Sequence, residues 1–188
     1  MKRYRYRRIS IWTLIIAILT LLGAGVTQKG QVVLPTLSSQ PGFYPVTHVT
    51  DGDTIEVNLA GKNEIVRLIG IDTPEEKDPR KPVQCYALAA AQHMQQLAGD
   101  KSVRLEADPD TSDRDKYNRL LRYVYLSDGT FVNQAQVQQG YGFAYTIFPN
   151  SKLDQFRAWE REARGANRGL WAGCQIHSEG EKEQTNDQ

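Results

Sequence analysis

The chain has 188 residues, which is enough for one domain with its own hydrophobic core. Five of its 23 basic residues lie in residues 1–8 and no acidic residue lies in residues 1–26, so the remainder carries 18 basic and 22 acidic residues, a net charge of −4. This balance excludes a polycation that binds nucleic acid through its overall charge, and a nucleic-acid site would have to be local.

Residues 1–26 read as a segment separate from the domain. Its basic residues are Lys2, Arg3, Arg5, Arg7 and Arg8. They precede an apolar run over residues 9–26 that contains small residues near its end, an order typical of a secretory signal. The run is also near the minimum length for a membrane-spanning helix, so the segment is either a cleaved signal or a retained anchor. In both cases we expect a secreted or membrane-anchored protein whose domain faces outside the cytoplasm, because the positive flank stays inside.

Residues 27–43 are rich in Ser, Gln, Gly and Pro and are typical of a linker. The domain is predicted over residues 44–174. Alternating apolar and polar residues predict five strands, over residues 44–50, 54–59, 64–71, 102–107 and 120–126. Helices are expected over residues 84–97 and 132–139, and a last helix follows Ser151 as its N-cap. The acidic segment 175–188 is predicted to be a disordered tail.

This order of elements indicates an α+β domain. Five short strands that could close on themselves, with helices to one side, favour a small barrel of the OB-fold type. On the strand over residues 64–71, Ile65, Arg67 and Ile69 share one face while Val66 and Leu68 share the other. Arg67 is therefore expected to project from a structured strand.

The two cysteines of the chain are Cys85 and Cys174. An exported protein favours a disulfide between them, which would close a loop of about 90 residues and add roughly 4–5 kcal/mol of stability by the chain-entropy rule. The alternative is two unpaired thiols, because sequence does not show how far apart they lie.

Acidic residues gather near the ends of two predicted strands, beside an arginine. Asp51-Gly52-Asp53-Thr54 comes first, and Arg67 is soon followed by the stretch from Asp72 to Glu75. Carboxylates suit a divalent cation, and a guanidinium suits a phosphate. A second cluster with basic residues, Asp115-Lys116-Tyr117-Asn118-Arg119, lies further along the chain. Together these residues indicate a metal-dependent phosphodiesterase.

These blocks, in this order, resemble the signature of the staphylococcal nuclease (thermonuclease) family over roughly residues 44–172. The resemblance implies an OB-fold barrel with three helices. It also implies a calcium-dependent endonuclease that acts on DNA and RNA and leaves 3′-phosphorylated products. We further expect a monomer.

The resemblance also assigns roles to individual residues. Metal ligands would be the carboxylates of Asp53 and Asp72 and the carbonyl oxygen of Thr73. Catalysis would rest on Arg67, Glu75 and Arg119, with Glu75 as general base and the arginines around the scissile phosphate. Nucleotide contacts would come from Lys116, Tyr117 and Tyr145. Asp51 is expected to shape a turn rather than to bind the metal.

Three alternatives stay open. Tyr145 could be a core or edge residue instead of a base-stacking one, and Ile147 stands where the family has a second tyrosine, which leaves base stacking in doubt. The arginines could form surface ion pairs. The domain could also be a catalytically inactive OB-fold module that only binds nucleic acid, although such a module should lack one of the site residues.

Overall fold

The computed structural model describes residues 42–76 and 82–187, which all belong to one compact unit. The predicted signal or anchor, residues 1–26, and the linker as far as residue 41 lie outside the described residues. Across residues 42–76 and 82–187, no helix is long and apolar enough to span a membrane.

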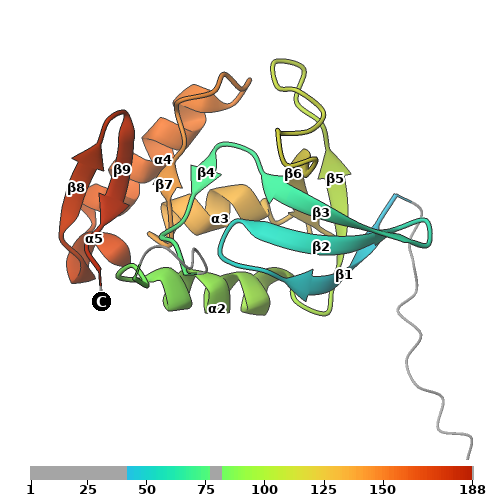
Figure 1. Cartoon of the computed structure of the whole chain (residues 1–188), viewed down its shortest axis with the longest axis horizontal. Coiled ribbons are helices and arrows are strands. Elements are labelled where there is room, and N and C mark those ends of the chain that lie inside the picture. The colour runs from blue at the N-terminus through green and yellow to red at the C-terminus, as the bar shows by residue number, and fades with distance from the viewer. Residues whose placement is uncertain (1–41, 77–81, 188) are drawn as a thin grey trace, which may run out of the picture. The chain divides into compact units, whose positions relative to one another are not determined.

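Five strands form a closed barrel in the order β1–β2–β3–β6–β5 (Figure 1). They are β1 (Tyr44–Val49), β2 (Thr54–Leu59), β3 (Lys62–Leu68), β5 (Ser102–Glu106) and β6 (Leu120–Leu126). Neighbours pair antiparallel except β3 and β6, which run parallel with Val66 opposite Leu120. The α+β class and the five-stranded OB-type barrel predicted from the sequence are confirmed.

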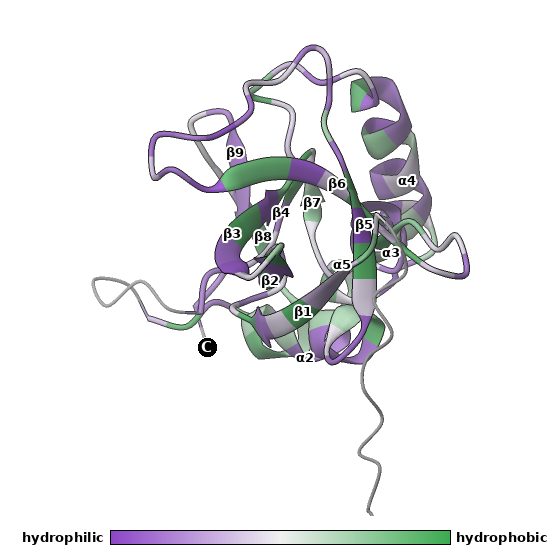
Figure 2. Cartoon of the chain, turned by 90° about the vertical axis from the view of Figure 1, so that its right-hand side faces the viewer, coloured by the Kyte–Doolittle hydropathy of each residue, from purple (hydrophilic) through white to green (hydrophobic). Residues whose placement is uncertain are grey.

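Side-chain alternation builds the barrel, because one face of each strand lines the core. Val66 and Leu68 of β3 are fully buried with Ile55 of β2, whereas Ile65 is 45% exposed. Arg67 therefore lies on the outer face of β3, as the alternation predicts. Figure 2 shows hydrophobic and hydrophilic residues together along the barrel strands, and mainly hydrophilic residues along the last long helix, α4.

Three longer helices accompany the barrel, in agreement with the expectation: α2 (Ala87–Ala98), α3 (Val132–Gln138) and α4 (Leu153–Gly165). A four-residue helix, α5 (Leu170–Gly173), follows them. Helix α2 starts three residues later than predicted, because Tyr86 adopts a left-handed backbone conformation (φ 73°) that the helix cannot continue through.

Ser151 does not cap α4, so this detail of the prediction is wrong. The position before the helix is Lys152, which makes no side-chain cap bond. The backbone amide of Ser151 instead donates to Asp108 Oδ2 at 2.9 Å, and its hydroxyl donates to the same oxygen. A buried carboxylate that accepts several hydrogen bonds competes successfully for this serine.

The strand predicted over residues 64–71 is interrupted. β3 ends at Leu68, Gly70 turns the chain with a φ of 77°, and β4 (Ile71–Asp72) pairs with β7 (Phe143–Ala144). A Cβ atom at Gly70 would lie 2.3 Å from the Phe156 ring, so both the backbone and the packing require glycine. This turn carries Asp72 back towards the side chain of Arg67.

The predicted disordered tail is wrong for most of its length. Residues Ile176–Glu179 (β8) and Lys182–Thr185 (β9) form an antiparallel hairpin beyond α5. Its polar sequence lacks the apolar alternation that marks a strand, and its order comes from tertiary contacts. Thr185 is fully buried and its hydroxyl donates to the Cys85 carbonyl, while the Cys85 amide donates to Asn186.

Cys85 and Cys174 are joined in a disulfide, with their Cα atoms 5.9 Å apart. Of the two alternatives left open by the sequence, the structure therefore has the disulfide. The bond ties the segment before α2 to the segment that leads from α5 into β8.

Candidate active site

A cavity of about 800 Å³ is lined by the turn before β2, the end of β3 and the segment after it, the loop between β5 and β6, the segment after β7, and one residue of β9 (Lys182–Thr185). All nine residues expected to act in catalysis, metal binding or nucleotide binding line this cavity. They are Asp53, Arg67, Asp72, Thr73, Glu75, Lys116, Tyr117, Arg119 and Tyr145. The fold thus gathers residues that are up to 92 positions apart in the sequence, from Asp53 to Tyr145.

The turn before β2 brings Asp53 to the cavity. Asp51 Oδ1 accepts the Asp53 amide at 3.0 Å, which is the turn role expected for Asp51, although Asp51 also lines the cavity. A Cβ atom at Gly52 would lie 2.8 Å from both Ala90 and Thr73, so only glycine allows this close approach. The Gly52 carbonyl accepts the side-chain amide of the fully buried Gln136, which anchors the turn to α3.

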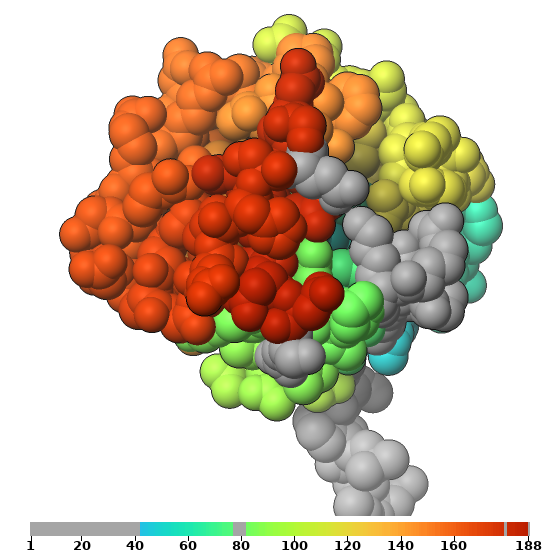
Figure 3. Space-filling model, turned by 60° about the vertical axis from the view of Figure 1, so that its left-hand side comes forward, coloured from blue at the N-terminus to red at the C-terminus, as the bar shows by residue number. Residues whose placement is uncertain are grey.

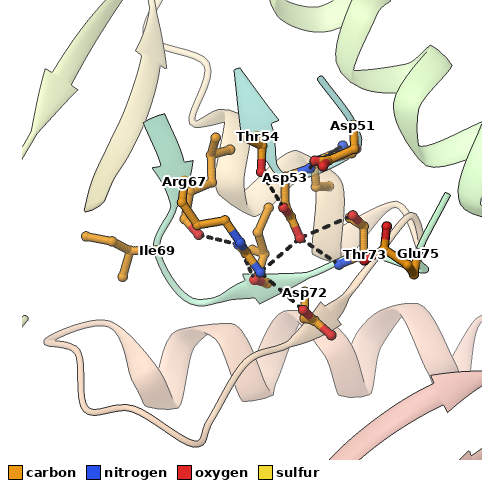
Figure 4. A network of polar contacts seen from close by, with 12 residues as sticks. Asp51, Asp53, Thr54, Arg67, Ile69, Asp72, Thr73 and Glu75 are labelled. Carbon is orange, nitrogen blue, oxygen red and sulfur yellow. Dashed lines mark hydrogen bonds and ion pairs between the residues drawn. The ribbon is translucent and has the colours of Figure 1, made fainter. Parts of the chain in front are cut away.

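Arg67 is held on both sides of its guanidinium. Its Nη1 donates to the carbonyl oxygens of Leu68 and Ile71, at 2.8 Å each. Its Nη2 lies 2.9 Å from Asp53 Oδ2 and 3.1 Å from Asp72 Oδ1 (Figure 4). The arginine therefore brings the two carboxylates together and has a fixed orientation, which a flexible surface ion pair would not provide.

Burial and crowding of negative charge dominate the electrostatics here. Burial raises the pKa of Asp51 to about 7, with a further contribution from the charge of Asp53. Burial also raises the pKa of Asp72, partly offset by Arg67. The pKa of Arg67 is raised because the charges of the nearby carboxylates outweigh its own desolvation. Three acidic groups thus share one deeply placed arginine, an arrangement that further positive charge would stabilise.

The segment after β4 places Thr73 and Glu75. The Thr73 amide and hydroxyl donate to Asp53 Oδ2 at 3.0 and 3.2 Å. The Glu75 amide donates to Gln84 Oε1 at 2.6 Å, and the Gln84 amide donates to the Glu75 carbonyl at 3.0 Å. These bonds fix the backbone of Glu75 beside the carboxylates (Figure 4).

Arg119 reaches the cavity from the loop before β6. Asp115 Oδ2 accepts its Nε at 2.7 Å, and Asp115 Oδ1 accepts the backbone amides of Tyr117 and Arg119. These hydrogen bonds, led by the one from Arg119, outweigh the effect of burial and lower the pKa of Asp115. Lys116 lies in the same loop with its Nζ 5.0 Å from the centre of the Tyr117 ring, and Tyr117 is 68% exposed at the cavity rim.

The residues predicted to hold a metal suit a hard cation. Within the described ranges, no three His, Cys, Asp or Glu side chains converge on a metal position by themselves. The candidate set instead combines the carboxylates of Asp53 and Asp72 with the backbone carbonyl of Thr73, all oxygen donors of the kind that calcium takes. The raised pKa values of Asp51 and Asp72 mean that burial disfavours their charged forms, which a bound cation would favour.

Among the further residues that line the cavity, Phe148 and Lys182 could contact a ligand and were not predicted from the sequence. Phe148 is 62% exposed and its ring centre lies 5.8 Å from that of Tyr145. Lys182 of the C-terminal hairpin places its Nζ 2.9 Å from Asp72 Oδ2. Phe148 could have been noticed as an aromatic residue close to Tyr145, but nothing in the local sequence marks Lys182.

Comparison with known proteins agrees with the motifs. The model of the family "Staphylococcal nuclease homologue" matches residues 65–173. Endonuclease YncB of Bacillus subtilis is 41% identical over 124 residues, 65% of this chain and 58% of that protein. SPbeta prophage-derived endonuclease YokF of the same organism is 40% identical over 65% of this chain and 41% of its own length, so this chain spans only part of either protein. A thermonuclease of Staphylococcus intermedius is 35% identical over 84% of this chain and 93% of its own length.

Proposed function

The chain belongs to the staphylococcal nuclease family, and from this we propose that it is a calcium-dependent endonuclease that hydrolyses phosphodiester bonds of DNA and RNA. The observation that carries the proposal is one cavity whose lining brings Arg67 and Arg119 together with the carboxylates of Asp53, Asp72 and Glu75. The curated relatives that are named endonucleases or thermonucleases support the same reaction class.

Glu75 and the two arginines, Arg67 and Arg119, have different roles in the reaction. Glu75 accepts a proton from the attacking water, which adds to phosphorus in line with the leaving 5′ oxygen. Arg67 and Arg119 pair with phosphate oxygens and stabilise the negative charge that redistributes as the phosphorus becomes five-coordinate. The P–O5′ bond breaks and the departing 5′ oxygen takes a proton from solvent, so one product carries a 3′-phosphate and the other a 5′-hydroxyl.

Asp53, Asp72 and the Thr73 carbonyl would hold calcium beside these groups. When bound, calcium supplies further positive charge to the phosphate. The raised pKa values of Asp51 and Asp72 support this assignment, because a nearby cation relieves the cost of several buried carboxylates.

The basic and apolar residues of the first 26 positions support an extracytoplasmic location, in which the domain is either released or tethered through residues 9–26. We expect the enzyme to act there as a monomer. Lys116, Tyr117 and Tyr145 would bind the nucleotide next to the scissile phosphate, with the exposed ring of Tyr117 open to the substrate.

The decisive experiment is hydrolysis of single-stranded DNA and RNA by the full-length protein, with calcium and then with EGTA. We expect calcium-dependent cleavage that leaves 3′-phosphate ends, identified by their removal with a phosphatase. Glu75→Gln should lower turnover by at least about 100-fold and keep strand binding. The matched control is Glu76→Gln, a neighbour that does not line the cavity. A folded wild-type protein that binds strands without cutting them would instead establish the inactive binding module.

A further inference from the structure

We propose that Lys182 is an additional substrate-binding residue of this site, and that its ammonium group contacts a phosphate of the bound nucleic-acid strand. The inference rests on the proposed nuclease function and deepens it. The residue lies beyond residue 173, where the match to the family model ends, so the C-terminal hairpin would give this chain a cation that the matched region does not supply.

Lys182 faces the same cavity as the catalytic groups. It lines the cavity together with Arg67 and Tyr145, and its Nζ lies 2.9 Å from Asp72 Oδ2. The other oxygen of this carboxylate, Oδ1, is already paired with Arg67. An ammonium group has three protons to donate and Asp72 takes one, so Lys182 can pair with Asp72 and a phosphate oxygen at once. Its side chain is 39% exposed, which leaves it accessible to a strand.

The hairpin that carries Lys182 is firmly attached. The disulfide joins Cys174, just before β8, to Cys85. Arg164 of α4 donates to both carboxylate oxygens of Glu183, at 2.9 and 2.7 Å. Figure 3 shows the C-terminal residues, in red, packed against the green segment that includes the start of α2. Contacts before and after Lys182 in the sequence therefore hold the strand that carries it in place.

The same hairpin is connected to the expected general base. Gln84 Nε2 donates to Gln184 Oε1 at 3.0 Å, and Gln84 Oε1 accepts the Glu75 amide at 2.6 Å. One glutamine side chain thus bonds both the strand that carries Lys182 and the backbone of Glu75. The position of the strand that carries Lys182 is therefore coupled to the position of the Glu75 backbone.

Stability alone is a weak reason for the Lys182–Asp72 pair. Partly exposed ion pairs stabilise folded proteins little, and removing a lysine from Asp72 would leave that carboxylate still paired with Arg67. A phosphate contact is the better explanation, since phosphates of a strand are attracted to each lysine or arginine they meet.

The test compares three variants in a Glu75→Gln background, which prevents cleavage: Lys182→Gln, Lys182→Arg and the control Lys62→Gln. Lys62 also pairs with a carboxylate, Glu64, but its side chain is 77% exposed and does not line the cavity. Binding of a fluorescent single-stranded oligonucleotide is measured by anisotropy in calcium, over a range of salt concentrations. Circular dichroism verifies the fold of each variant.

We expect Lys182→Gln to weaken strand binding about fivefold. The slope of log affinity against log salt concentration should decrease in magnitude by about 0.7, which is the change expected when one phosphate contact to a single strand is lost. Lys182→Arg should retain the slope, and Lys62→Gln should match the parent. In the cleaving enzyme, Lys182→Gln should raise KM more than it lowers kcat.

An unchanged affinity and slope in Lys182→Gln would overturn the proposal. If calorimetry then showed tighter calcium binding in that variant, Lys182 would be only a competitor of the metal at Asp72. Failure of the proposed function has a different signature, because in that case the Glu75→Gln parent would bind no strand, or the wild-type protein would bind strands without cleaving them.

Discussion

Asp115 directs the guanidinium of Arg119, since its Oδ2 accepts Arg119 Nε at 2.7 Å while its Oδ1 accepts the Arg119 backbone amide at 3.0 Å. One carboxylate thereby fixes both the side chain and the main chain of a residue that lines the cavity. Arg119 thus reaches the cavity with its orientation already set, and binding a phosphate should require little rearrangement.

Asp115→Asn should therefore lower kcat about tenfold, because Arg119 loses the charged partner that orients it. Arg119→Lys should lower kcat by a factor of about 100 or more, because lysine does not pair in a fork with phosphate oxygens. Steady-state kinetics on DNA measures both. Asp113→Asn is the control, since Asp113 pairs with Arg122 and does not line the cavity. Equal losses in Asp113→Asn and Asp115→Asn would refute a special role for Asp115.

Phe148 should provide base stacking where the family's second tyrosine is replaced by Ile147. Phe148→Ala should weaken binding of single-stranded DNA by about 1–3 kcal/mol, because its exposed ring lies beside that of Tyr145 at the cavity. Anisotropy measurements with the Glu75→Gln protein avoid cleavage. Ile147→Ala, next to it but away from the cavity lining, should have little effect, and the reverse order of the two variants would contradict the assignment.

Asn133 of α3 connects the turn that follows β3 to strand β6. It is fully buried, its Nδ2 donates to the Ile69 carbonyl at 2.9 Å, and its Oδ1 accepts the Val124 amide at 2.9 Å. Asn133→Ala should lower the free energy of unfolding by about 3 kcal/mol, since two buried backbone groups lose their partner. Urea titration measures it. Gln134→Ala on the same helix removes only a contact with Gln138 and should be nearly neutral.

The disulfide should be a major source of stability, because its two cysteines are 89 residues apart. Replacing both cysteines by alanine should lower the free energy of unfolding by about 4–5 kcal/mol. Urea titration with and without a reductant gives a built-in control, since reductant should destabilise only the wild-type protein. A double variant as stable as the oxidised wild type would show that the loop entropy is offset elsewhere.

Asp108 should make stability depend on pH below neutrality. Burial acts to raise its pKa, but hydrogen bonds from Ser151 and Tyr123 outweigh burial and lower the pKa in the folded state. The stabilisation is therefore complete above the unfolded-state pKa of about 4 and is lost as the pH falls through the lower folded-state value. Urea titrations at pH 7 and pH 3 should show a smaller difference for Asp108→Asn than for wild type. The same pH difference in both proteins would contradict this.

The sequence predicts the barrel well because its strands alternate. The bounds predicted for β2 and β6 agree with the structure, since Ile55 and Val57 on one strand and Tyr123 on the other face a continuous core. Acids at strand ends beside an arginine indicated a phosphodiesterase, and the family resemblance assigned the individual residues. The structure brings the turn at Asp53 and the strand end at Asp72 to the same arginine, Arg67.

What the sequence does not predict depends on contacts made at long range. The C-terminal hairpin has few apolar residues, and its order depends on the disulfide and on Gln84, about a hundred positions earlier. Lys182 is consequently indistinguishable from a solvated tail lysine in the sequence. The early end of β3 likewise reflects Gly70 and its packing against Phe156, which local alternation does not show.

The parallel pairing of β3 with β6 has a consequence for folding kinetics. The β2–β3 hairpin joins Thr54 to Arg67 across a short loop, whereas Val66 pairs with Leu120, 54 positions later in the sequence. Pairings between distant segments slow folding, to the range of milliseconds to seconds in barrels of this kind. The half of the site that holds Asp53 and Arg67 can therefore form early, and Arg119 joins it only when the barrel closes.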